Sequence, residues 1–71
     1  MTNCSKLKGK IAEKGYKLTE FADIIGMSRP TFRSRMRGKS QFKVDEIEVI
    51  CSTLGITPGD VWAYFFTPKV P

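Results

Sequence analysis

The sequence predicts an all-α fold with five helices and no strand, and three observations support this prediction. Apolar residues recur at helical spacing in the second half of the chain. The clearest set stands at positions i, i+3, i+4 and i+7 and consists of Ile47, Ile50, Cys51 and Leu54. Gly55 follows directly and is a typical helix end. The 71 residues are enough for one compact domain with a small core and leave no room for a second domain.

Two helices are expected before residue 27. Asn3 or Ser5 can cap a first helix that runs to Lys14, because a side-chain oxygen at the N-cap accepts a hydrogen bond from a free backbone N–H. A second helix begins near Thr19 and stops at Gly26. It is so short that only packing against the rest of the domain can stabilise it.

A third helix opens at Ser28 or Arg29 and has a predictable orientation. At about 100° per residue, Phe32 and Met36 fall within about 40° of each other and define its buried side. Ser34 lies nearly opposite their midline. The face that cannot belong to the core therefore carries hydroxyl groups and arginines.

The fifth helix is expected to start with Thr57 as N-cap, Pro58 at the first position and Asp60 in a capping-box-like role. After it, residues 67–71 contain two prolines and should leave the helical body as a short tail. The predicted domain thus covers residues 1–66.

The fifth helix is almost wholly apolar. Val61, Trp62 and Phe65 are expected in the core, because a chain this short needs large side chains to fill its interior. Tyr64 and Phe66 are expected to stay exposed. The aromatic end is also the candidate contact with a protein partner, since exposed apolar patches mark interaction sites. The residues assigned to this contact are Trp62, Phe65 and Phe66.

Charge separates sharply along the chain. No acidic residue occurs between Asp23 and Asp45, and six basic residues fall in this interval. They are Arg29, Arg33, Arg35, Arg37, Lys39 and Lys43. Removing these six from the net charge of +5 leaves the rest of the chain at −1. The basicity is local, as binding to phosphate groups requires.

The order of short helix, glycine and arginine-bearing helix is the layout of a helix-turn-helix that reads DNA. Ala22 is small enough for two helices to cross, and Gly26 is free to turn between them. Arginine matches the guanine O6 and N7 pair, and a threonine methyl can contact the thymine methyl. An arginine-rich helix face is often only a solvated surface, but its combination with the glycine turn and the local charge favours DNA binding.

Other function classes find little support. The chain has no histidine, and Cys4 and Cys51 are too few for a zinc site, so we expect no metal and no cofactor. The carboxylates stand at helix caps and solvated positions, so we expect no enzyme, no catalytic residue and no small-molecule substrate. No segment approaches the ~20 apolar residues of a membrane span, and the N-terminus lacks the apolar run of a secretion signal. We therefore expect a cytoplasmic protein that does not bind membranes.

Two segments, FADIIGMSRPTFRSRMRGKSQF and VDEIEVICSTLGITPGDVWAYFF, resemble the lambda-repressor-like, or XRE-type, helix-turn-helix family and its small phage or prophage Cro-like regulators. The resemblance implies a compact five-helix lambda-repressor-like DNA-binding domain with the helix-turn-helix at the second and third helices. It implies a repressor that binds double-stranded operator DNA with its third helix in the major groove. The implied contacts to bases or nearby phosphates are Ser28, Arg29, Thr31, Arg33, Ser34 and Arg37. In the following loop, Lys39 is a further candidate for phosphate binding.

Two positions depart from the family pattern. Leu18 stands where many members have a glutamine that contacts phosphate. Met36 comes one residue later than the usual second anchor, which leaves Arg35 where an aliphatic residue is frequent. We therefore expect Arg35 along the surface of the domain and not at the bases.

Two hypotheses for the function remain open. In the first, the protein is a Cro-like repressor of a lysis-lysogeny switch that acts by occlusion, and a homodimer is expected because one recognition helix covers only a half-site. In the second, it is a modulator or antirepressor that binds the phage lysogeny repressor through protein contacts. The arginines favour the first hypothesis and the apolar end WAYFF favours the second.

Overall fold

The computed structural model describes residues 2–66, which form five α-helices and a short 3-10 turn without any strand in this range. The all-α prediction is confirmed. The elements, in chain order, are α1 (Cys4–Glu13), α2 (Leu18–Ile24), α3 (Arg29–Met36), α4 (Val44–Leu54), η1 (Pro58–Asp60) and α5 (Val61–Phe65). The short tail expected at 67–71 lies outside the described residues.

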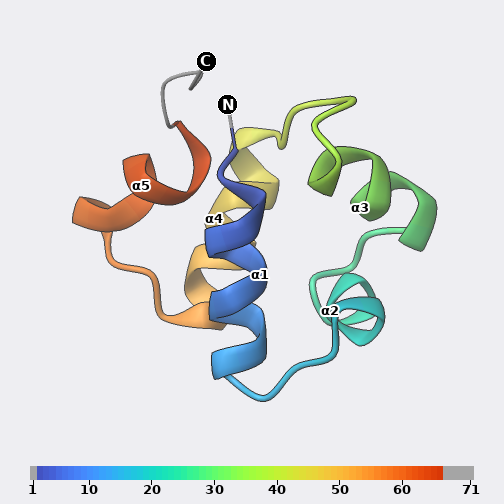
Figure 1. Ribbon diagram of the computed structural model, residues 1–71, viewed down its shortest axis with the longest axis horizontal. Coiled ribbons are helices and arrows are strands. Elements are labelled where there is room, and N and C mark those ends of the chain that lie inside the picture. The colour runs from blue at the N-terminus through green and yellow to red at the C-terminus, as the bar shows by residue number, and fades with distance from the viewer. Residues whose placement is uncertain (1, 67–71) are drawn as a thin grey trace.

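Helix α1 lies in front of α4 at the centre of the molecule, with α2 and α3 to one side and α5 to the other (Figure 1). The most completely buried side chains come from these central helices and from α2. They are Leu7, Ile11, Phe21, Ile50 and Leu54. The helix-turn-helix segment thus rests on one side of a core that α1 and α4 build.

A chain of aromatic rings links the two sides of the domain. The ring centroid of Phe32 on α3 is 6.0 Å from that of Phe21 on α2 and 6.3 Å from that of Phe42 in the loop before α4. Phe42 in turn packs edge-on against Phe65 of α5, at 5.7 Å. These buried contacts hold α3 at a fixed position relative to the rest of the core.

The helix ends largely follow the sequence signals. The Asn3 side chain accepts a hydrogen bond from the Lys6 N–H at 3.1 Å, which confirms Asn3 as the cap of α1. Ser28 caps α3 in the same way, through the Thr31 N–H. Gly55 ends α4 with a φ of 69°, a left-handed conformation that glycine adopts without strain.

The start of the last helix differs from the prediction. Residues Pro58–Asp60 form the 3-10 turn η1, and the α-helix begins only at Val61. The Thr57 hydroxyl makes no hydrogen bond to the backbone and instead donates to the Asp60 carboxylate at 3.1 Å. The expected side-chain cap is absent, and the turn is closed by a backbone hydrogen bond in which the Asp60 N–H donates to the Thr57 carbonyl at 2.9 Å.

The orientation of α5 corrects two predictions about its aromatic residues. Trp62 was expected in the core but is 70% exposed, whereas Tyr64 was expected outside but is buried. The backbone N–H of Asn3 donates to the Tyr64 carbonyl at 2.7 Å, and this bond holds the Tyr64 side of α5 against the start of α1. Residues two positions apart differ by about 200° around a helix, so Trp62 must then face away.

Three other expectations for α5 hold in full or in part. Phe65 is buried and Phe66 is exposed, both as predicted. Val61 is only half-buried, at the edge of the core rather than inside it. Because α5 is a single short turn, its buried side is narrow and is filled by Tyr64 and Phe65.

No helix among residues 2–66 combines the length and the apolar character that crossing a bilayer requires. Within the same range, no group of three or more His, Cys, Asp or Glu side chains is placed to hold a metal ion. Cys51 is half-buried on α4, and burial raises the pKa of its thiol. The thiol therefore stays protonated at neutral pH.

Candidate nucleic-acid interface

The rotation of α3 about its axis is set by two buried side chains. Phe32 and Met36 are 4% and 5% exposed, and they anchor the helix to the core as predicted. Arg33 and Arg37, one turn apart, are both exposed. Within residues 2–66 neither of these arginine side chains makes a hydrogen bond or an ion pair. The two guanidinium groups are therefore available to a ligand.

Arg29, Arg33 and Arg37 recur every four residues, and we call them the arginine row. Unlike the other two, Arg29 forms an ion pair within residues 2–66. Its Nη2 donates to the Asp23 carboxylate of α2 at 2.9 Å, and both side chains are well exposed. The hydrogen bond to Asp23 and the attraction of that carboxylate raise the pKa of Arg29. The ion pair links the N-terminal turn of α3 to the end of α2 and leaves only part of this guanidinium free for DNA.

Ser28 and Thr31 form a closed pair at the start of α3. The Ser28 hydroxyl donates to the Thr31 hydroxyl at 2.7 Å and accepts from the Thr31 N–H at 3.3 Å. Ser28 is exposed and Thr31 is half-buried. Both hydroxyls keep acceptor capacity, and the Thr31 hydroxyl proton is free to donate. Their predicted contacts with DNA are compatible with this geometry.

Ser34 lies in a less open position than helix periodicity indicates. It is half-buried, and its hydroxyl is 3.2 Å from that of Ser40 in the loop that follows α3. The loop folds back beside α3, and the Lys39 N–H donates to the Ser34 carbonyl at 3.1 Å. Lys39 itself is exposed. The contacts predicted for Ser34 and Lys39 with DNA stay predictions.

Arg35 points away from the other arginines. Its Nε donates to the Glu46 carboxylate of α4 at 2.7 Å and its Nη1 donates to the Ser40 hydroxyl at 2.9 Å. The two charged side chains are only 13% and 16% exposed. Arg35 lies between α3 and α4 rather than along the open surface, where it was expected. Its expected separation from the bases stays a prediction.

The ion pair with Arg35 determines the ionisation state of Glu46. Burial by itself raises the pKa of Glu46. Hydrogen bonds from the Arg35 side chain and the Lys43 backbone N–H, together with the charges of both residues, outweigh this effect and lower the pKa. Glu46 therefore stays ionised at neutral pH and neutralises Arg35 within the domain.

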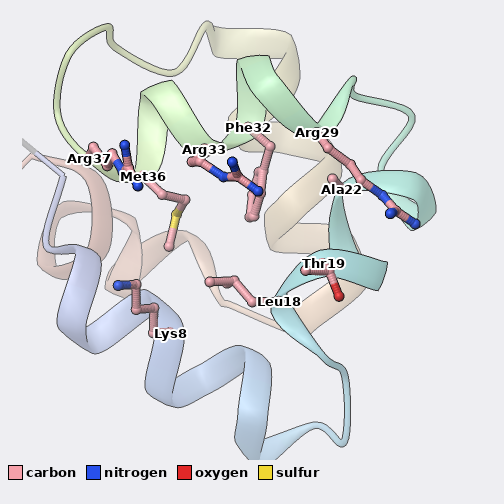
Figure 2. Close-up of a pocket in the computed structure, with 9 residues that line it drawn as sticks. All are labelled: Lys8, Leu18, Thr19, Ala22, Arg29, Phe32, Arg33, Met36 and Arg37. Carbon is pink, nitrogen blue, oxygen red and sulfur yellow. The ribbon is translucent and has the colours of Figure 1, made fainter.

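A hollow of about 220 Å³ opens beside the arginine row, between α1, α2 and α3 (Figure 2). Its floor is mainly apolar and its rim is basic. The lining residues are Lys8, Leu18, Thr19, Ala22, Arg29, Phe32, Arg33, Met36 and Arg37. No acidic side chain is among them.

Sequence reasoning missed two residues of this hollow as parts of the interface. Lys8 stands on α1, 25 residues before Arg33, and no local motif connects them. Leu18 was noted only as a departure from the family pattern, yet it is 38% exposed and lies in the opening. The packing of α2 against both α1 and α3 brings these residues to the same surface.

The aromatic end forms a separate surface beyond α1 and α4. Trp62 and Phe66 are both exposed, and their ring centroids are 4.9 Å apart. Phe65, the third residue assigned to a partner contact, is buried against Phe42 and is not accessible from this surface. We call the exposed pair of Trp62 and Phe66 the aromatic ridge.

A comparison with known protein families identifies the family of this chain. Residues 6–66 match the sequence model of the family described as Cro/C1-type HTH DNA-binding domain. No curated protein sequence is significantly similar to the chain. The match extends over all five helices except the first two residues of α1, so it covers both the arginine-bearing α3 and the core that supports it. The chain therefore belongs to the Cro/C1-type helix-turn-helix DNA-binding family.

Proposed function

We propose that the protein is a sequence-specific transcriptional repressor of the Cro type, which acts in the cytoplasm on phage or prophage operator DNA. The observation that carries this proposal is the pair of exposed arginines, Arg33 on α3 and Arg37 at its C-terminal cap, which have no carboxylate partner among the described residues. Repression results from occlusion, because a bound domain of this size blocks access to the DNA without needing a ligand.

The chemistry of the arginines supports sequence reading rather than phosphate binding alone. The major groove of B-DNA is about 12 Å wide and admits one α-helix. A guanidinium that enters it can donate two parallel hydrogen bonds to guanine O6 and N7. Arg33 and Arg37 stand one turn apart, so they reach successive positions along the groove. The N-terminal end of α3 then lies near the DNA backbone, since helix N-termini often contact phosphate. Ser28, Arg29 and Thr31 stand at this end.

Selection from a random double-stranded DNA library tests this function. We expect the purified protein to enrich one sequence, with guanines at the positions that Arg33 and Arg37 reach. The enriched sequence should bind much more tightly than unrelated DNA of the same length, and the DNA around the protein's own gene should contain a related sequence. Failure to enrich any sequence would contradict the proposal.

A homodimer is the second part of the proposal, and the α4 and α5 face supports it. A groove of about 620 Å³ runs between these helices, with mostly apolar lining that includes Ile47, Cys51 and Val61. Phe66 borders the groove, and the Trp62 ring packs against Phe66 in a tilted arrangement. An exposed ring next to an apolar groove on one chain is self-complementary, because each ring can enter the groove of the other copy in a two-fold dimer.

Replacing Trp62 by Ser tests this interface. We expect Trp62→Ser to weaken self-association and cooperative DNA binding while the melting temperature of the monomer stays nearly unchanged, since the side chain is 70% exposed. Sedimentation and thermal unfolding measure the two effects. Lys14→Ala, another exposed substitution, serves as the control. Unchanged association in Trp62→Ser would exclude the aromatic ridge as the dimer contact.

The same aromatic ridge supports the alternative function, in which the protein modulates a phage lysogeny repressor by binding it. Under this alternative, a mixture with the repressor forms a complex that Trp62→Ser weakens, and the isolated protein does not enrich a DNA sequence. The DNA selection and the sedimentation experiment therefore separate the two functions.

A further inference from the structure

The hollow in Figure 2 joins basic side chains from two elements that are far apart in the sequence. Lys8 of α1 lies on one side of the opening, and the arginines of α3 lie on the other. Leu18 stands between them, and Met36 reaches down from α3 toward the same point. A ligand that enters here meets positive charge on two sides and an apolar surface below.

The size and the lining of the hollow restrict the ligand. Its volume of about 220 Å³ far exceeds the ~10–15 Å³ that one water molecule requires, so more than a methyl group can enter. The apolar floor favours a carbon-rich ring, and the basic rim favours an anion on either side of that ring. The backbone of DNA alternates a deoxyribose ring with an anionic phosphate and presents both features in this order.

The position of the hollow selects the backbone over the bases. When α3 lies in the major groove, the helices packed beside it lie outside the groove, where a strand passes. Lys8 and Leu18 belong to these flanking helices. They therefore face the sugar–phosphate wall of the groove rather than the base edges at its floor.

We propose that the hollow seats one nucleotide of a DNA strand by its backbone, with the deoxyribose packed on Leu18 and Met36 and the adjoining phosphate bound by Lys8. The proposal rests on the DNA-binding function described above and deepens it. Lys8 then fixes the register of α3 in the groove without reading sequence, since phosphate contacts carry no sequence information directly.

The first test compares two lysine variants on the selected DNA and on unrelated DNA. We expect Lys8→Ala to weaken binding to both by a similar factor and to reduce the slope of log K against log salt by about 0.9 for each copy of Lys8 in the complex. Lys14→Ala removes the same charge from the C-terminal cap of α1, where the ammonium lies near Gly55, the C-terminal cap of α4, and not in the hollow. It should leave the slope unchanged.

The second test keeps Lys8 and neutralises the phosphate that it is proposed to bind. Single phosphates of the selected DNA are replaced one at a time by neutral methylphosphonates. Wild-type protein should lose affinity at a phosphate whose replacement no longer affects Lys8→Ala, because the contact is already absent in that variant. Leu18→Ala should lower affinity without changing the salt slope, since it removes apolar contact with the sugar and no charge.

Equal losses for wild type and Lys8→Ala at every phosphate would overturn the proposal, as would a salt slope for Lys8→Ala that equals that of Lys14→Ala. Far-ultraviolet circular dichroism checks that each variant is folded. If selection yields a tightly bound DNA but Lys8 shows no coupling to any phosphate, only the role of the hollow fails. If selection yields no DNA sequence, the proposed function itself fails.

Discussion

The two sides of α3 both carry arginine, but the arginine on one side is paired and enclosed and those on the other are exposed and unpaired among the described residues. On one side, Arg35 is held between α3 and α4 by Glu46 and Ser40 and is almost buried. On the other side, Arg33 and Arg37 are exposed and have no carboxylate partner among residues 2–66. The charge of one arginine is neutralised within the domain, and the charges of the other two are left for a ligand.

This difference shows that the local sequence does not determine what an arginine does. Arg33, Arg35 and Arg37 alternate along one short stretch and have the same intrinsic chemistry. Their roles diverge because Phe32 and Met36 fix the rotation of the helix, which directs residue 35 toward α4. An acidic residue is present on α4 at that point and absent from the lining of the hollow. The fold thereby pairs one arginine within the domain and leaves two exposed.

The largest expected effect is the salt dependence of DNA binding through the side of α3 that carries Arg33 and Arg37. If a dimer makes on the order of 6 to 10 phosphate contacts, its affinity for DNA should fall by about 10³ to 10⁵ between 50 and 200 mM salt. Arg35→Ala should keep the wild-type slope, because that arginine is already paired with Glu46. Fluorescence anisotropy with labelled DNA measures both. If affinity hardly changed with salt, or if Arg35→Ala reduced the salt slope, the proposed difference between the two sides of α3 would be wrong.

A smaller effect is expected on the stability of the fold when Arg35, on the side of α3 that packs on α4, is replaced. Arg35→Ala leaves Glu46 with one charged partner fewer in a mostly buried position, so the free energy of unfolding should fall by about 1–3 kcal/mol. Arg33→Ala removes the same side chain from the exposed face and should stay within about 0.5 kcal/mol of wild type. Urea unfolding of the two variants compares them directly. Equal stability of both variants would mean that the ion pair with Glu46 contributes little.

The smallest effect concerns pH. The pKa of Glu46 is lower in the folded protein than in the unfolded chain, so its ionised form adds stability that is complete above about pH 5 and is lost as the pH falls below about 4. In Glu46→Gln this contribution is absent at every pH. The difference in unfolding free energy between wild type and Glu46→Gln should therefore shrink on acidification. A difference that stays constant from pH 6 to pH 3 would contradict the lowered pKa.

Much of the fold could be predicted from the sequence, because its helices have strong local signals. Asn3, Ser28 and Gly55 mark helix ends by their own chemistry, and the structure places helix ends at all three. The last helix was predicted less well. Val61–Phe65 is nearly all apolar and gives no periodic pattern that would identify its buried side. The burial of Tyr64 and Phe65 defines that orientation, and it depends on contacts with distant residues such as Phe42.

The candidate site was predictable where it depends on α3 alone. The spacing of Phe32 and Met36 placed Arg33 and Arg37 on the exposed side. Contributions from other elements were not predictable. Ser34 is half-covered by the loop that follows α3, and Lys8 reaches the surface only through the packing of α1. Both depend on tertiary structure, which the pattern of a single helix does not contain.

The central claim is that Arg33 and Arg37 read DNA sequence, and a double variant of these two residues tests it most directly. The ratio of affinities for the selected DNA and for unrelated DNA is measured for wild type, for Arg33→Ala with Arg37→Ala, and for a control with Lys6→Ala and Lys14→Ala. The control also removes two charges, one on α1 and one at its C-terminal cap, and neither residue lines the hollow. We expect the arginine variant to lose about 1–3 kcal/mol of specific binding for each lost contact, roughly 5- to 150-fold, and to lose its sequence preference, while the control keeps the ratio. A folded arginine variant that keeps the wild-type ratio would contradict the claim.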